Sequence, residues 1–182
     1  MRPKLGATRR RDVFVNCPFD DEYLPQFDAL LFAILACGFR VRCALEIQDS
    51  GEIRLQKILK LIGQCDWGVH DLTRMGLDVD SGLPRFNMPF ELGLFLGARH
   101  FGNKTQQPKR CLILDEEPYR YQKSLSDIAG QDIQYHGANP LVVIKRVRDW
   151  LQTCRSRPDL PGSAAVIQDF KQFLMCVLQE SW

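Results

Sequence analysis

The sequence predicts an α/β fold, in which a five-stranded parallel sheet with strand order 2-1-3-4-5 is flanked by helices and followed by one further helix. Two observations lead to this prediction. Short apolar runs alternate along the chain with longer segments whose apolar residues recur at helical spacing. Repeated β-α units of this kind form parallel sheets through right-handed crossovers, and the doubly wound order is the natural arrangement of five strands.

The expected strands are short, and turn-forming residues separate them from the helices. Strands are predicted at 13–16, 39–45, 67–70, 111–114 and 132–135, the last of them weak. Helices are predicted at 25–37, 52–64, 88–100, 139–155 and 164–180. Pro25 and Gly38 mark the start and the end of the first helix. Pro158, Pro161 and Gly162 separate the last helix from the rest.

Two of these helices carry expectations about particular residues. In the second helix, Ile53 should face inward with the other apolar residues, whereas Lys57 should face solvent. In the third helix, Asn87 is a suitable N-cap. Gly93 and Gly97 lower the helix propensity there, and we expect them to allow close packing against the sheet.

The composition limits the class of protein. The chain has 182 residues, of which 45% are hydrophobic and 25% charged, and its formal net charge is +2. This balance gives no reason to expect nucleic acid as a partner, and no apolar run approaches the length of a membrane span. We expect a basic, partly disordered lead-in at 1–11, an α/β domain at 12–157 and a helical extension at 158–182.

The cysteines and the N-terminus indicate a cytoplasmic protein. The seven cysteines form no C-x-x-C pair, and most lie in apolar runs, so free buried thiols are expected rather than disulfides or a metal site. The positively charged N-terminus has no apolar segment behind it, so no signal peptide is expected.

The topology predicts where a ligand binds. In flavodoxin-like sheets, ligands lie beyond the carboxyl ends of the strands, where the strand order reverses. The loops after the first and third strands and the start of the third helix should therefore form one pocket. The residues that we expect to bind a ligand there are Asn16, Pro18, Phe19, Asp20, Arg54, Arg74, Arg85 and Asn87.

Two segments without clear periodicity are expected to be loops, at 72–87 and at 116–127. Long loops in a compact domain are often functional. The first of them contains Arg74 and Arg85, which could bind phosphates as the loop closes over a ligand, and Arg54 is another candidate for a phosphate.

Glu91 is the strongest catalytic candidate. It lies one turn into the third helix among apolar neighbours, where a carboxylate is costly to bury without a partner or a task. Stabilisation by the helix dipole is its structural alternative. Asp71, at the end of the third strand, is the second candidate, with a simple strand-end turn as its alternative. His70 should face the other side of the sheet, as a half-buried structural histidine.

Two short motifs resemble a known enzyme superfamily. The segment 14–19 (FVNCPF) resembles the first strand and Pro-Phe loop of nucleoside 2-deoxyribosyltransferases, and the segment 91–98 (ELGLFLGA) resembles their Glu-x-Gly-x-x-x-Gly-small helix. The order of elements over 12–150 is also similar to that of TIR domains, in which Asn87 would often be a tryptophan. The resemblance implies that Glu91 is the catalytic carboxylate.

The resemblance further implies cleavage of an N-glycosidic bond at C1′ of a ribose. NAD loses a neutral nicotinamide, so that one carboxylate suffices, whereas a purine nucleoside needs a second acid, here Asp71 or Asp20. We expect a TIR-like enzyme that hydrolyses or cyclises NAD or a related nucleotide, with NAD as substrate rather than cofactor and with no metal. The alternatives are a nucleoside 2-deoxyribosyltransferase or nucleotide N-glycosidase, and a non-catalytic nucleotide-sensing or interaction module. A role in prokaryotic defence, as a homo-oligomer or with a defence-system partner, is also implied.

Overall fold

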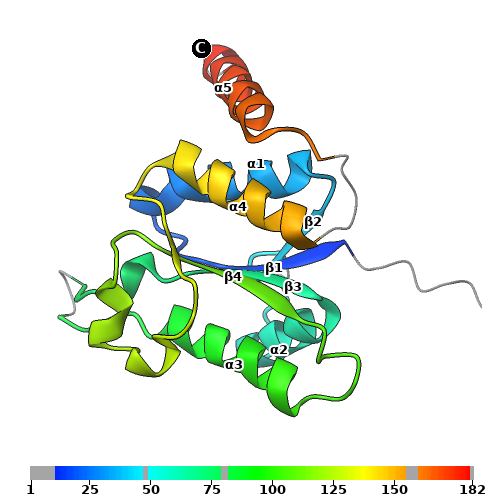
Figure 1. The fold of residues 1–182 in the computed structure, drawn as a ribbon, viewed down its shortest axis with the longest axis vertical. Helices are drawn as coiled ribbons and strands as arrows, with labels where there is room; N and C mark the ends of the chain where they lie inside the picture. The colour runs from blue at the N-terminus through cyan, green and yellow to red at the C-terminus, as the bar shows by residue number, and fades with distance from the viewer. Residues whose placement is uncertain (1–10, 47–48, 79–81, 155–159, 181–182) are drawn as a thin grey trace, which may run out of the picture.

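The computed structural model describes residues 11–46, 49–78, 82–154 and 160–180. Within these residues lies a five-stranded, all-parallel sheet in the order β2-β1-β3-β4-β5 (Figure 1). The strands are β1 (Asp12–Asn16), β2 (Arg40–Cys43), β3 (Trp67–Asp71), β4 (Arg110–Asp115) and β5 (Gln134–Tyr135). The predicted fold class and strand order are confirmed. The predicted lead-in and the boundary near residue 157 fall almost wholly outside the described residues.

The two central strands are buried on both faces. β1 and β3 are covered along their whole length, and Val15 pairs with Val69 across the ladder. Successive side chains alternate between the faces. Val13, Val15 and Val69 therefore join the core on one face, and Phe14 contacts the His70 ring on the other. Such strands need helices on both sides of the sheet.

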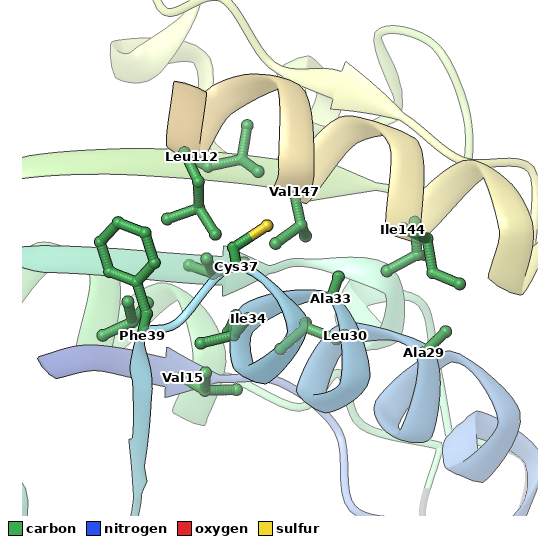
Figure 2. Packing of buried hydrophobic residues seen from close by; sticks show 14 of the residues in the cluster. Val15, Ala29, Leu30, Ala33, Ile34, Cys37, Phe39, Leu112, Ile144 and Val147 are labelled. Atoms are coloured by element: carbon green, nitrogen blue, oxygen red, sulfur yellow. The ribbon is translucent and has the colours of Figure 1, made fainter. Parts of the chain in front are cut away.

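The helices form one layer on each face of the sheet (Figure 1). α1 (Leu24–Ala36) and α4 (Pro140–Cys154) cover one face, and α2 (Arg54–Gln64) and α3 (Asn87–Phe101) cover the other. Figure 2 shows the core of the first layer, where small residues of α1 lie opposite apolar residues of α4. Ala29, Ala33, Ile144 and Val147 are all fully buried there.

The last helix, α5 (Ser163–Glu180), packs across α1 and α4. Val166 and Phe170 are buried, and the Phe170 ring lies 5.3 Å from the Phe32 ring between centroids. Further along, Met175 is 63% exposed. The first half of α5 thus covers other helices of the chain. None of the helices in the described part of the chain has the length and apolar character needed to cross a membrane.

The segment after β1 and the two predicted loops contain short 3-10 helices rather than longer elements. They are η1 (Asp21–Tyr23), η2 (Thr73–Met75), η3 (Arg120–Lys123) and η4 (Ser126–Ile128). All seven cysteines are free and five of them are buried, as expected.

Three predictions about the second and third helices are wrong. Ile53 is 64% exposed, because α2 begins only at Arg54 and Ile53 stands outside its apolar face. Lys57 is buried instead, and its ammonium donates to the backbone carbonyl of Asp49. Asn87 does not cap α3, since it is the first helical residue and no side chain makes a capping hydrogen bond there.

The glycines of α3 do not provide the close packing that we expected. A Cβ at Gly93 or Gly97 would meet nothing within 4 Å. The close approach occurs at Gly68 in β3, where a Cβ would lie 2.8 Å from His70 Nε2 and 2.9 Å from the Phe95 ring. The missing side chain on the strand, rather than on the helix, lets α3 pack against the sheet.

Candidate functional site

Glu91 is a buried carboxylate without a partner. The residue is 7% exposed, and it makes no hydrogen bond or ion pair with any residue that the structure describes. Burial raises the pKa of Glu91 to about 7, and the positive charge of Arg54 opposes this shift. A strongly shifted carboxyl group with no structural partner is typical of a functional site.

The position of Glu91 on α3 places it on the side of α2. Phe95 and Ala98, one and two turns further along, pack in the cluster formed by α2 and Phe14. Met88 and Leu92 occupy the other packed face of α3. Helical spacing therefore assigns Glu91 to the face that Arg54 approaches.

Asn16 connects the end of β1 to the start of α3. Its side-chain amide donates to the backbone carbonyl of Met88 at 2.8 Å and lies 3.1 Å from His70 Nδ1. Because Nδ1 accepts, the ring proton belongs on Nε2, which is buried and has no hydrogen-bond partner in the described residues. Burial also lowers the pKa of His70 to about 3. His70 is thus a neutral structural histidine, more deeply buried than predicted, and both Asn16 amide hydrogens are already in use.

The segment after β1 lies close to both predicted carboxylates. Burial raises the pKa of the Cys17 thiol, and the negative charges of Asp71 and Glu91 raise it further. Pro18 is buried, and the Phe19 ring packs edge-on against Phe27 of α1 at 5.5 Å between centroids. Glu91 therefore lies near the end of β1, as the topology predicts, whereas Pro18 and Phe19 serve packing.

Asp71 points to the opposite face of the sheet from Glu91. It is fully buried and accepts hydrogen bonds from Tyr23 Oη at 2.6 Å, from the backbone amide of Thr73 at 2.9 Å, and from the Thr73 hydroxyl at 2.5 Å. His136 Nε2 lies 3.1 Å away. Burial raises the pKa of Asp71, but these bonds, His136 foremost, hold it below its usual value. The structure does not bring the two predicted catalytic carboxylates together.

The side chains that contact Asp71, namely Tyr23, Thr73 and His136, were not predicted from the sequence. They come from η1, η2 and the segment after β5, and nothing in their spacing marks them as neighbours of Asp71. His136 could have been noticed as one of only three histidines in the chain.

The predicted phosphate-binding arginines of the 72–87 segment are held by carboxylates. Arg74 contacts Asp20 at 3.0 Å and Glu22 at 2.5 Å. Arg85 contacts Asp20 at 3.0 Å and Asp78 at 3.1 Å. Burial raises the pKa of Asp20, and the hydrogen bond and charge of Arg74 outweigh that effect and lower it. Asp20 therefore orders these loops as an ionised acid.

Two neighbouring cavities lie at the carboxyl ends of the strands. One, of about 380 Å³, is lined by the loops after β1, β3 and β4. The other, of about 270 Å³, lies between the loop after β3, the start of α3 and η3. The loops after the first and third strands thus meet as predicted, but Glu91 lines neither cavity.

Of the other predicted ligand-binding residues, Arg54 is near Glu91 and Asn87 is exposed. Arg54 is the first residue of α2, is exposed, and makes no hydrogen bond with the described residues. No group of three or more histidine, cysteine, aspartate or glutamate side chains in the described part of the chain could hold a metal ion. Neither a protein-family model nor a curated protein matches the chain.

Proposed function

We propose that the chain cleaves the N-glycosidic bond of NAD or a related nucleotide, with Glu91 as the catalytic carboxylate. The observation that carries this proposal is the Glu91 carboxylate itself, buried and without a hydrogen bond among the described residues. A nearby cation favours the charged form of such a group. NAD brings a positive charge to the bond that breaks.

The proposed reaction needs one carboxylate. The bond between ribose C1′ and the pyridinium nitrogen breaks, and its electron pair goes to the nitrogen, so that nicotinamide leaves as a neutral molecule. Positive charge develops on the ribose, and Glu91 offsets it or bonds to C1′. Water then adds at C1′ and releases a proton, which yields ADP-ribose. In cyclisation, a nucleophile of the same nucleotide takes the place of water.

The environments of Asp71 and Asp20 favour NAD over a neutral nucleoside as the substrate. A purine leaves as an anion unless an acid protonates it. Asp71 is held by hydrogen bonds on the other face of the sheet, and Asp20 lies between Arg74 and Arg85. Both have a pKa below the usual value, so neither holds a proton at neutral pH. Nucleoside 2-deoxyribosyl transfer lacks its acid in this arrangement.

Two further residues would support the reaction. Asn16 fixes the first turn of α3, and with it the position of Glu91, through its bond to Met88. Arg54 lies close enough to lower the pKa of Glu91 and has no hydrogen bond within the described chain, so it is the candidate for a nucleotide phosphate. The role in prokaryotic defence and the self-association implied by the resemblance stay predictions.

The experiment is incubation of the full chain with NAD and, separately, with deoxynucleosides, followed by chromatography of the products. We expect nicotinamide release from NAD, and a loss on the order of 10²-fold or more in Glu91→Gln. Glu117→Gln is the matched control, because Glu117 is exposed on the loop after β4. Circular dichroism checks that both variants fold. Intact NAD with wild type, or full turnover in Glu91→Gln, would contradict the proposal.

A further inference from the structure

The smaller cavity at the carboxyl edge has apolar walls. It measures about 270 Å³, close to the lower end of the range for small-molecule sites. Its apolar lining comes from three separate segments of the chain and includes Met75, Pro84, Phe86, Pro89 and Leu125. A cavity of this size accommodates a compact ring system rather than an extended chain.

This cavity is separate from the Glu91 site. Pro89 lines it from the first turn of α3, on the side where Met88 and Leu92 pack with Met75. Glu91 belongs to the other side of the helix, toward α2, and feels the charge of Arg54 there. A ligand in the cavity would therefore contact the start of α3 without touching Glu91.

The charged residues of the cavity wall are all cationic. Arg85, Arg120 and Lys123 line it, and no described aspartate or glutamate does. Arg120 is held in place by two backbone carbonyls after β3 and by the Asp115 carboxylate. Lys123 is exposed and makes no hydrogen bond or ion pair within the described residues. Its ammonium is free to meet an anion at the rim.

The neighbouring cavity has the opposite character. The two cavities share Gly76, Leu77, Arg85 and Arg120, but the larger one is lined by five carboxylates against three arginines. The five are Asp20, Asp21, Glu22, Asp78 and Glu116. The charged lining residues thus change from mainly acidic in the larger cavity to basic in the smaller one. The anionic end of a ligand should therefore lie on the side of Lys123.

We propose that the apolar cavity beside α3 binds a small amphipathic anion, an apolar ring system that carries a single carboxylate. The rings pack between Met75, Phe86 and Leu125, and the carboxylate pairs with Lys123 at the rim. Burial of the rings supplies affinity. Lys123 selects the anion over a neutral molecule of the same shape, because Arg85 and Arg120 are already paired with carboxylates.

The test uses 2-naphthoate as the probe, titrated into the isotope-labelled full chain and followed by amide chemical shifts and calorimetry. Lys123→Gln removes the free cation, and Lys145→Gln, at an exposed lysine of α4, is its matched control. Gly76→Leu adds an apolar side chain at the cavity wall, where a Cβ meets nothing within 4 Å and the φ of −71° suits any residue.

We expect saturable binding at one site, with shifts centred on Met75, Phe86 and Leu125. The neutral analogue 2-naphthylmethanol and the Lys123→Gln variant should each bind at least about tenfold more weakly. Gly76→Leu should abolish binding, and Lys145→Gln and Glu91→Gln should leave it unchanged, whether or not the chain cleaves NAD. Absence of saturable binding, equal affinity for the neutral analogue, or sensitivity to Glu91→Gln alone would overturn the proposal.

Discussion

Asn16 and Met88 are joined by a 2.8 Å hydrogen bond from the side-chain amide of Asn16 to the backbone carbonyl of Met88. The bond ties the carboxyl end of β1 to the first turn of α3, three residues before Glu91. A second contact of the same amide reaches His70 at the end of β3. One side chain thus holds three elements at the point where the strand order reverses.

Asn16→Ala should destabilise the protein and weaken NAD cleavage. It leaves two buried acceptors, the Met88 carbonyl and His70 Nδ1, without a donor, at a cost of about 1 to 3 kcal/mol. Urea unfolding measures the loss. Asn87→Ala is the control, because Asn87 is exposed and makes no capping bond, and it should change the free energy of unfolding by less than about 0.5 kcal/mol. Equal effects of the two substitutions would contradict the role of Asn16.

Glu91→Gln should gain stability relative to wild type as the pH rises. Burial raises the pKa of Glu91 to about 7, so the folded protein binds this proton more tightly than the unfolded chain does. The contribution of Glu91 to stability is therefore present at about pH 4 and is lost as the pH rises to about 7. Glutamine mimics the protonated acid.

Urea unfolding at several pH values measures this difference. At about pH 8 the variant should be more stable by about 1 to 2 kcal/mol, less than the whole pKa shift implies, because solvent screens the charge. A constant difference between Glu91→Gln and wild type across the range would count against a buried, unpaired carboxylate.

The rate of NAD cleavage should depend on the ionisation of Glu91. A carboxylate that offsets positive charge must be deprotonated, and kcat/KM reports the free enzyme. We expect kcat/KM to rise with pH through an apparent pKa of about 7 and then to level off. Initial rates of nicotinamide release across this range measure the profile. A profile that stays flat through neutral pH would assign Glu91 another role.

Two glycine substitutions should have opposite effects. Gly68→Ala places a methyl group 2.8 Å from His70 Nε2 and 2.9 Å from the Phe95 ring, and such overpacking costs about 1 to 3 kcal/mol. Gly93→Ala meets nothing within 4 Å on an exposed part of α3, and its better helix propensity should stabilise by about 0.5 to 1 kcal/mol. Thermal unfolding compares the pair. The same sign for both would refute the packing described at Gly68.

Phe170→Ala should loosen α5. Phe170 is 2% exposed and its ring contacts Phe32 of α1, so truncation removes buried apolar surface and costs about 3 kcal/mol or more. Met175→Ala, at a site 63% exposed, should cost less than about 0.5 kcal/mol. Denaturant unfolding and protease cleavage between α4 and α5 report the difference. Similar stability of the two variants would show that α5 does not anchor through Phe170.

Sequence periodicity was sufficient to predict the sheet order and to place Glu91 near the carboxyl end of β1. Both follow from short-range patterns. Alternating apolar runs identify β-α units, and the handedness of crossovers limits their order. Glu91 is recognisable because it is a single acid in an apolar helical run. The faces of α2 were less predictable, because the helix begins at Arg54, two residues later than predicted, and Ile53 is left exposed before its first residue.

The partners of the remaining side chains were decided by the tertiary structure alone. Asp71 meets Tyr23 and His136, and Asp20 meets Arg74 and Arg85, across separations of 48 to 65 residues. Such pairs form only when distant loops come together, and no local spacing encodes them. The sequence by itself therefore determined the order of strands and helices and identified Glu91 as the unusual acidic residue. The folded chain decided which of the other polar groups contact one another, because hydrogen bonds and ion pairs form only between groups that the topology brings together.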